Sequence, residues 1–394
     1  MTLAGLSFAY LRSRPLALTL NLLLLALGVA TITVLLLATE QLEERMLRDA
    51  RGIDLVVGAK GSPMQLVLSA VFHLDAPTGN IPLADAEALG KQQQRLIKKA
   101  IPLALGDSYQ GFRIVGSNHG YPVHYGARLA HGRLWKAPME AVLGAEAAAK
   151  TRIAVGGKFS GAHGLGEGGD AHENEPYVVV GLLERSGTVL DRLVLTSVES
   201  VWEVHQHGAS ADAPKELTAL LVQYASPLAV ATLPRIVNAS PALQAASPAY
   251  ESARLFRMIG VGVDVLRAFG AILMLAAGLS VFIALWNALE ERRYDLAVMR
   301  MLGASPGRLM RLMLLEGCAL SLAGGIAGIA LGHLLTEALG AAMRQMQQTA
   351  ITGWTWSVQE AWVLAAAVGV GLVAALLPAL RAYRSDVAPV LAEG

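Results

Sequence analysis

The chain has 394 residues, of which 54% are hydrophobic and only 16% are charged, and its mean hydropathy is +0.46. Soluble domains carry roughly 25% charged residues, so this balance indicates a membrane protein. The net charge of +1 gives no support for nucleic-acid binding, and the single cysteine, Cys318, excludes an intramolecular disulfide.

Four segments lack charged side chains over about 20 residues or more, enough for a helix to cross a bilayer core of roughly 30 Å. They are residues 15–39, 268–289, 317–336 and 361–380. The first segment is longer than the apolar core of a signal peptide, about 7 to 15 residues, and a charged stretch follows it in place of a cleavage site. We therefore expect four transmembrane helices, with the first retained as an anchor.

Arginine placement predicts the orientation. Arginines precede the first segment, follow the fourth and gather between the second and third, whereas the loop between the third and fourth offers only Arg344. By the positive-inside rule, both termini and residues 290–311 are cytoplasmic, and residues 40–267 lie outside.

These spans predict how the chain is divided. The expected parts are a cytoplasmic N-terminus (1–14), a first transmembrane helix (15–39), stalks and an extracytoplasmic domain (40–267), a second transmembrane helix (268–289), a cytoplasmic coupling helix and loop (290–311), a third transmembrane helix (312–340), a short external loop (341–360), a fourth transmembrane helix (361–381) and a cytoplasmic tail (382–394).

The external region mixes β-rich and helical runs. Strands are predicted in IDLVVGA, AVLG, PYVVVGLL, DRLVLTS and LTALLVQY, and helices in AEAAAK, VESVWEVH and PLAVATLPRIV. The glycine-rich residues 156–176 predict an irregular loop. The expected fold class is a membrane protein with four transmembrane α-helices and a large α+β extracytoplasmic domain between helices one and two.

A charged but periodic stretch, ERRYDLAVMRMLG, separates the second and third spans. A connector needs only a few polar residues, yet this stretch has an apolar stripe that predicts an amphipathic helix. The stripe is Tyr294, Ala297, Val298, Met301 and Leu302. Gly303 is placed to end this helix, and Ser305 and Pro306 to begin the next one.

This stretch resembles the cytoplasmic coupling region of FtsX-like and macrolide-exporter-type ABC permeases. The matching residues are Glu291, Arg292, Asp295, Leu296, Ala297, Met299, Arg300, Leu302, Gly303, Ala304 and Ser305. The C-terminal stretch with Pro378, Arg381, Pro389 and Leu391 resembles the ending of the same family. The VLG, VVVGLL and DRLVLTS runs are similar to its periplasmic core domain, and the order of one helix, a large domain and three helices agrees.

The resemblance implies a permease of the bacterial cytoplasmic membrane that works as a homodimer on a separate ABC ATPase subunit, with a periplasmic protein or lipoprotein as a further possible partner. ATP and magnesium would be held by the ATPase. This chain itself is expected to hold no cofactor and to catalyse no reaction, because its nearest approach to a phosphate-binding loop, GGKFSG, lacks the hydroxyl residue after the lysine. The implied ATPase-coupling residues are Arg292, Arg293, Tyr294, Asp295, Ala297, Val298, Met299, Arg300, Leu302 and Gly303.

Two features of the third span have alternative interpretations. Gly324, Gly328 and Gly332 form a small-residue face that suits either a dimer seam or packing within the subunit. Glu316 is a potential proton site, although pairing with Arg311 or Arg381 is the simpler interpretation.

External histidines suggest two further hypotheses. His163 and His172 lie among carboxylates, and His205 and His207 follow a predicted helix, so these four are metal candidates, although they lack the spacing of structural zinc sites. The chain would then be a metal-linked transport or transfer component. Alternatively, it would be a regulatory scaffold that activates an external hydrolase.

Overall fold

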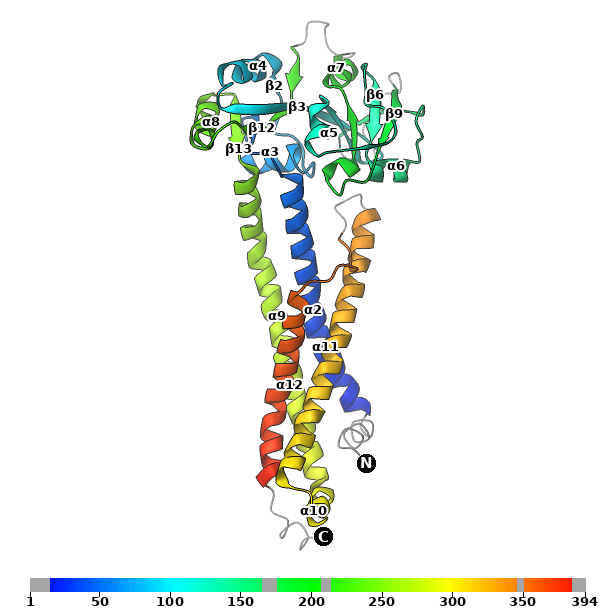
Figure 1. Cartoon of the computed structure of the whole chain (residues 1–394), viewed down its shortest axis with the longest axis vertical. Helices are drawn as coiled ribbons and strands as arrows, with labels where there is room; N and C mark the ends of the chain where they lie inside the picture. The colour runs from blue at the N-terminus through cyan, green and yellow to red at the C-terminus, as the bar shows by residue number, and fades with distance from the viewer. Residues whose placement is uncertain (1–14, 165–175, 207–213, 346–350, 385–394) are drawn as a thin grey trace. The chain divides into compact units, whose positions relative to one another are not determined.

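The computed structural model describes residues 15–164, 176–206, 214–345 and 351–384 (Figure 1). The chain divides into two compact units, which are Met1–Leu42 with Ile259–Gly394, and Glu43–Met258.

Long apolar helices build the first unit, and one end of each of the first two belongs to the second unit. They are α2 (Pro15–Asp49), α9 (Pro248–Glu291), α11 (Pro306–Gln345) and α12 (Gln359–Arg384), and the shorter α10 (Arg293–Met301) follows α9. The four long helices have the length and composition needed to cross a membrane, which confirms the predicted number of spans. Helices α2 and α9 continue through the charged stretches that were predicted as stalks.

Helix α11 packs on α2 through its row of glycines. A Cβ atom at Gly328 would lie 2.6 Å from Cβ of Val29 and 2.8 Å from the carbonyl oxygen of Ala26. A Cβ at Gly324 would lie 2.9 Å from Cδ2 of Leu25, and one at Gly332 would lie 2.7 Å from Cβ of Thr33. Helix α2 of the same chain therefore occupies the glycine face, as in the second of the two interpretations above.

Exposed tryptophans lie near the start of α12. Trp354, Trp356 and Trp362 are all largely exposed. Tryptophan is enriched where a membrane helix meets water, and this position agrees with an external loop before the fourth span.

A mixed β-sheet forms the centre of the second unit. Within the described residues its order is β13-β1-β12-β3-β4-β10-β6-β9-β5, with β7 paired to β9 and β8 paired to β3. The strands are β1 (Leu55–Ala59), β3 (Ile97–Tyr109), β4 (Phe112–Ser117), β5 (Leu129–Gly132), β6 (Glu140–Leu143), β7 (Lys158–Phe159), β8 (Ala162–His163), β9 (Tyr177–Leu183), β10 (Leu193–Thr196), β12 (Ala219–Tyr224) and β13 (Leu243–Ala246), and β2 (Ile81–Pro82) pairs separately with β11 (Glu216–Leu217).

Helices cover this sheet. They are α3 (Pro63–Ala70), α4 (Leu83–Gln92), α5 (Gly120–His124), α6 (Ala145–Thr151), α7 (Val198–Gln206) and α8 (Pro227–Ala239), with a 3-10 turn at Val189–Arg192. Two apolar clusters form the core, one around Leu55, Leu220 and Leu233 and one around Ile114 and Val179. The α+β prediction is confirmed.

The prediction of an irregular loop over residues 156–176 is wrong in part. Strands β7 and β8 lie inside it and pair with β9 and β3. Their hydrogen-bonding partners are distant in sequence, so local glycine content could not reveal them. Residues 165–175 lie outside the described part of the chain.

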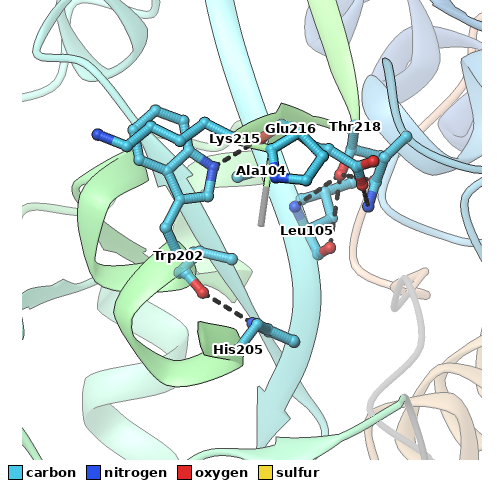
Figure 2. Close-up of a pocket in the computed structure, with 10 residues that line it drawn as sticks. Ala104, Leu105, Trp202, His205, Lys215, Glu216 and Thr218 are labelled. Atoms are coloured by element: carbon cyan, nitrogen blue, oxygen red, sulfur yellow. Dashed lines mark hydrogen bonds between the residues drawn. The ribbon is translucent and has the colours of Figure 1, made fainter. Parts of the chain in front are cut away.

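A cavity of about 360 Å³ lies between β3, α7 and β11 (Figure 2). Trp202 on α7 donates from Nε1 to the carbonyl oxygen of Glu216, over 2.6 Å. The ammonium of Lys215 lies 4.9 Å from the centre of the same indole ring. These contacts hold α7 against β11 along one wall of the cavity.

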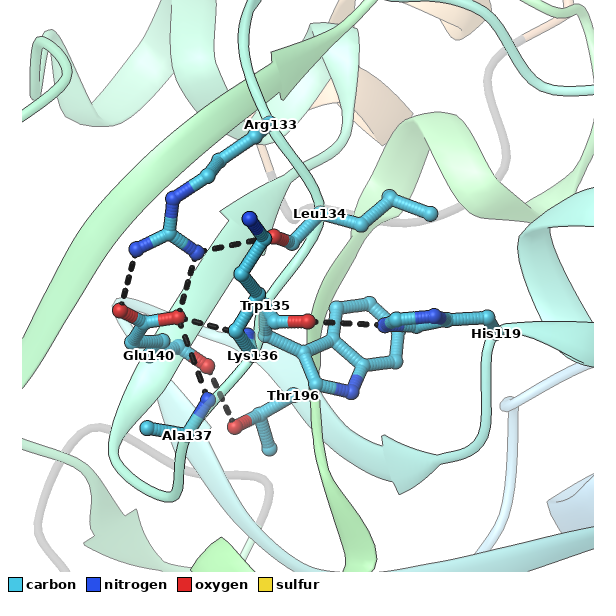
Figure 3. A network of polar contacts seen from close by, with 8 residues as sticks. All are labelled: His119, Arg133, Leu134, Trp135, Lys136, Ala137, Glu140 and Thr196. Carbon is cyan, nitrogen blue, oxygen red and sulfur yellow. Dashed lines mark hydrogen bonds and ion pairs between the residues drawn. The ribbon is translucent and has the colours of Figure 1, made fainter.

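Glu140, at the start of β6, is the centre of a polar network (Figure 3). Both of its carboxylate oxygens accept hydrogen bonds from the guanidinium of Arg133, and one also accepts from the backbone N–H of Lys136. The bonds from Arg133, and then that from Lys136, lower the pKa of Glu140 to about 2. The network fixes the loop that leads into β6.

This lowered pKa predicts how stability responds to acid. Ionised Glu140 stabilises the folded chain above the ordinary carboxyl pKa of 4.5, and this contribution is lost as the pH falls toward about 2. Glu140→Gln should therefore lower Tm at pH 7, and the difference from wild type should shrink between pH 4.5 and pH 3. Thermal unfolding of the full chain in detergent measures this. The control is Glu184→Gln at an exposed position, and a difference that does not change with pH would contradict the prediction.

The glycine contact with α2 gives a second prediction. Gly328→Ala places a methyl group where no Cβ fits, so it should destabilise the chain by about 1–3 kcal/mol. Gly369→Ala on α12 is the matched control, because a Cβ there meets nothing within 4 Å. Thermal unfolding of both variants in detergent should show a clear loss only for Gly328→Ala. Equal Tm values for Gly328→Ala and wild type would contradict the prediction, because they would show that the α2–α11 contact relaxes around the added methyl group.

Candidate coupling site

Helix α10 is closed by a regular C-terminal turn. Gly303 has φ +96°, the left-handed conformation that favours glycine. Its N–H donates to the carbonyl of Arg300, and the N–H of Ala304 donates to the carbonyl of Met299, both over 3.0 Å. This pair of bonds is a Schellman motif. The predicted end of the helix at Gly303 is confirmed, and α11 begins at Pro306 as expected.

One face of α10 is buried against the ends of the long helices. Leu296 is 3% exposed and lies in an apolar cluster with residues of α9, α11 and α12, and Met299 packs against the same cluster. Ala297 is also buried. The predicted apolar stripe is therefore divided, because Ala297 faces the bundle. The face of α10 that contains Leu296 buries apolar side chains at the ends of α9, α11 and α12.

The other face of α10 and its end remain exposed. Tyr294 is 56% exposed, Met301 67% and Leu302 83%. Arg293 and Asp295 are exposed, and Arg293 pairs with Glu290 over 2.9 Å. Of the other predicted coupling residues, Val298 and Arg300 are half-buried. Helix α10 therefore exposes apolar side chains at its C-terminal end while its opposite face is packed against the bundle.

The side chain of Arg292 is buried and forms an ion pair inside the bundle. Its Nη1 lies 3.3 Å from Oε1 of Glu316 on α11, and both side chains are nearly inaccessible to solvent. Arg292 was expected among the coupling residues, and its burial assigns it a structural contact. The predicted partners of Glu316, Arg311 and Arg381, were wrong: the fold brings Arg292, 24 residues earlier in the sequence, to this carboxylate.

Arg381 has a different role from the one predicted. Its guanidinium lies 2.7 Å from Glu290 and 4.3 Å from the centre of the Trp286 ring. Glu290 therefore joins α12 to Arg293 at the start of α10. These contacts fix the base of α10 on three helices.

The structure places the histidine candidates in the second unit. His163 and His205 converge on Asp107, a residue that sequence analysis missed. His172 and His207 lie outside the described residues. Sequence analysis also missed His333 on α11, which lies 3.0 Å from Glu360 on α12.

Comparison with known proteins agrees with this architecture of four spans and an external α+β domain. Residues 18–269 match the family described as MacB-like periplasmic core domain, and residues 267–387 match the FtsX-like permease C-terminal family. The chain is therefore a multi-pass membrane protein of the permease class, with its large domain on the extracytoplasmic side. It belongs to the FtsX-like and MacB-like family of ABC transporter permeases.

One curated relative is the "Uncharacterized ABC transporter permease YknZ" of Bacillus subtilis (strain 168). It is 27% identical over 139 residues, which are 34% of this chain and 32% of that protein. The match thus spans about a third of the relative. The crystal structure of the extracellular domain of the noncanonic ABC-type transporter YknZ from Gram-positive bacteria matches 48% of this chain and 98% of its own, with 14% identity and a TM-score of 0.32.

The buried ion pair gives a prediction for the site. Arg292→Met leaves Glu316 buried without its cation, which should cost about 3–5 kcal/mol. The double variant Arg292→Met with Glu316→Leu should recover most of this loss, because no unpaired charge remains. Thermal unfolding in detergent measures both. Arg293→Met, at a half-exposed pair, is the control, and an equal effect of the two single variants would contradict a structural role for Arg292.

Proposed function

We propose that this chain is the permease subunit of an ABC transporter that converts ATP hydrolysis by a separate ATPase into conformational work in the extracytoplasmic domain. ATP and magnesium belong to the ATPase in this proposal, and the permease catalyses no reaction. Two permease copies, each seated on one ATPase, form the working complex.

The observation that carries the proposal is the exposed apolar end of α10. Leu302 and Met301 project from a helix that is held on its other side by Leu296 and by the Arg292–Glu316 pair next to it. Large apolar side chains at the cytoplasmic surface of a membrane protein suit a protein interface. Because α10 is fixed to α9, α11 and α12, a force applied to its exposed end would act on the whole bundle.

The continuity of α2 and α9 supports the mechanical part of the proposal. Helix α9 runs for 44 residues without a break, about 66 Å at 1.5 Å per residue. It contains both an apolar span and the charged segment that leads from the extracytoplasmic domain. An uninterrupted helix can carry a displacement along its axis, whereas a flexible linker would absorb it.

The proposal predicts that a charge at the end of α10 separates the subunits. Leu302→Asp removes an apolar anchor and requires desolvation of a carboxylate, so recovery of the ATPase subunit with the purified permease should fall about tenfold or more. The measurement is co-purification of the co-expressed subunits. Met299 is unsuitable for this test because it packs against the bundle.

Leu228→Asp is the matched control, because Leu228 is an exposed leucine of α8 in the extracytoplasmic domain, 65% accessible to solvent. It should leave ATPase recovery unchanged. Thermal unfolding should show that both variants are folded. Full recovery of the ATPase with the Leu302 variant would overturn the assignment of α10 as the coupling helix.

A further inference from the structure

Three potential metal ligands from distant parts of the sequence meet in the extracytoplasmic domain. Asp107 lies on β3, His163 on β8 and His205 on α7. Nδ1 of His163 lies 3.1 Å and Nε2 of His205 lies 3.6 Å from the same atom, Oδ1 of Asp107. Their ligand atoms all lie within 4.8 Å of one another. Two imidazoles and one carboxylate thus point to a common centre.

The backbone builds this convergence. Asp107 and His163 are direct partners in the antiparallel pairing of β3 with β8, so their side chains lie on the same face. Gly106 makes room for the third ligand, since a Cβ there would lie 3.0 Å from Nε2 of His205. The sequence therefore has a glycine where a larger residue would push the imidazole away from Asp107.

A second contact orients His205. Its Nδ1 lies 2.7 Å from the carbonyl oxygen of Val201. A carbonyl can only accept, so Nδ1 carries the hydrogen and Nε2 of the neutral ring presents its lone pair to Asp107. A lone pair and a carboxylate oxygen repel unless a proton or a cation lies between them. A backbone carbonyl behind the imidazole is also the usual outer contact of a metal-binding histidine.

Two of the three ligand separations, both from Oδ1 of Asp107, fit a bound ion. Two ligands each 2.0–2.1 Å from a tetrahedral zinc ion lie about 3.4 Å apart. The observed 3.1 Å and 3.6 Å lie on either side of that value. Imidazole and carboxylate together suit a divalent transition-metal ion more than calcium or magnesium.

We propose that Asp107, His163 and His205 bind a divalent metal ion, with zinc as the preferred ion. These three ligands leave one tetrahedral position for water or an exchangeable group. Because Asp107 is 4% exposed, one ligand is held inside the domain while the two imidazoles lie nearer its surface. His205 also lines the cavity of Figure 2, so the ion would lie beside a space of about 360 Å³. The site is independent of the coupling helix.

Calorimetric titration of the full chain in detergent with Zn²⁺ alone tests the proposal. Wild type should bind one ion per chain at pH 7.5, and His163→Ala and His205→Ala should each weaken binding at least about tenfold. Asp107→Asn keeps the side-chain shape and should have a similar effect. His131→Ala, at an exposed histidine of β5, is the control and should bind as wild type does.

A spectroscopic measurement guards against variants that fail to fold. Wild type loaded with Co²⁺ should show the visible absorption of a four-coordinate nitrogen and oxygen site, and added Zn²⁺ should remove it. No binding by wild type would overturn the proposal and leave the cluster as a hydrogen-bonded His–Asp group. Unchanged affinity in the folded double variant of His163 and His205 would overturn it as well.

Discussion

The arrangement of the candidate coupling site depends on the need to pair a charge inside the helical bundle. Glu316 lies on the third membrane helix with its side chain almost wholly buried, and an unpaired carboxylate there would be costly. Arg292 supplies the opposite charge from the junction of α9 and α10. This contact fixes where α10 begins, and the turn at Gly303 fixes where it ends. Leu302 can project outward because both ends of the helix are constrained.

Close packing complements this pair elsewhere in the bundle. The glycines of α11 allow its backbone to approach α2 closely. In lipid the hydrophobic effect contributes little to helix association, so this contact depends on close van der Waals packing. Helix α11 is therefore joined to α2 by glycine packing and to α9 and α10 by charge. A displacement of α10 would then be shared among the helices instead of being absorbed at a single loose contact.

The membrane spans and α10 could be predicted from local signals in the sequence. These signals are the length of the apolar segments, the helical spacing of apolar residues and the helix-ending residue Gly303. Contacts between residues that are distant in the sequence could not be predicted from these signals. Arg311 and Arg381 were predicted as partners of Glu316 because all three lie near the inner membrane surface, whereas the fold brings Arg292 to it. Asp107 was missed for the same reason: β8 was hidden in a glycine-rich stretch, and only its register with β3 places His163 beside the carboxylate. Tertiary pairing, which no single segment encodes, decided each of these positions.

Three acidic side chains of α11 and α12 bear on what the bundle does: Glu316 and Glu360 are buried, and Glu337 is half-buried. Among the described residues, Glu316 is bonded to Arg292, and Glu360 accepts from the backbone N–H of Ser357 while lying 3.0 Å from His333. Glu337 accepts hydrogen bonds from Thr352 and Gly353 in the segment before α12. Each of these groups joins a helix to its neighbour or to a connecting segment. Groups that guide a polar substrate must exchange partners as it passes, whereas groups committed to such contacts stiffen the bundle. This use of polar residues supports the proposal that the permease transmits movement and does not conduct a polar substrate between these helices.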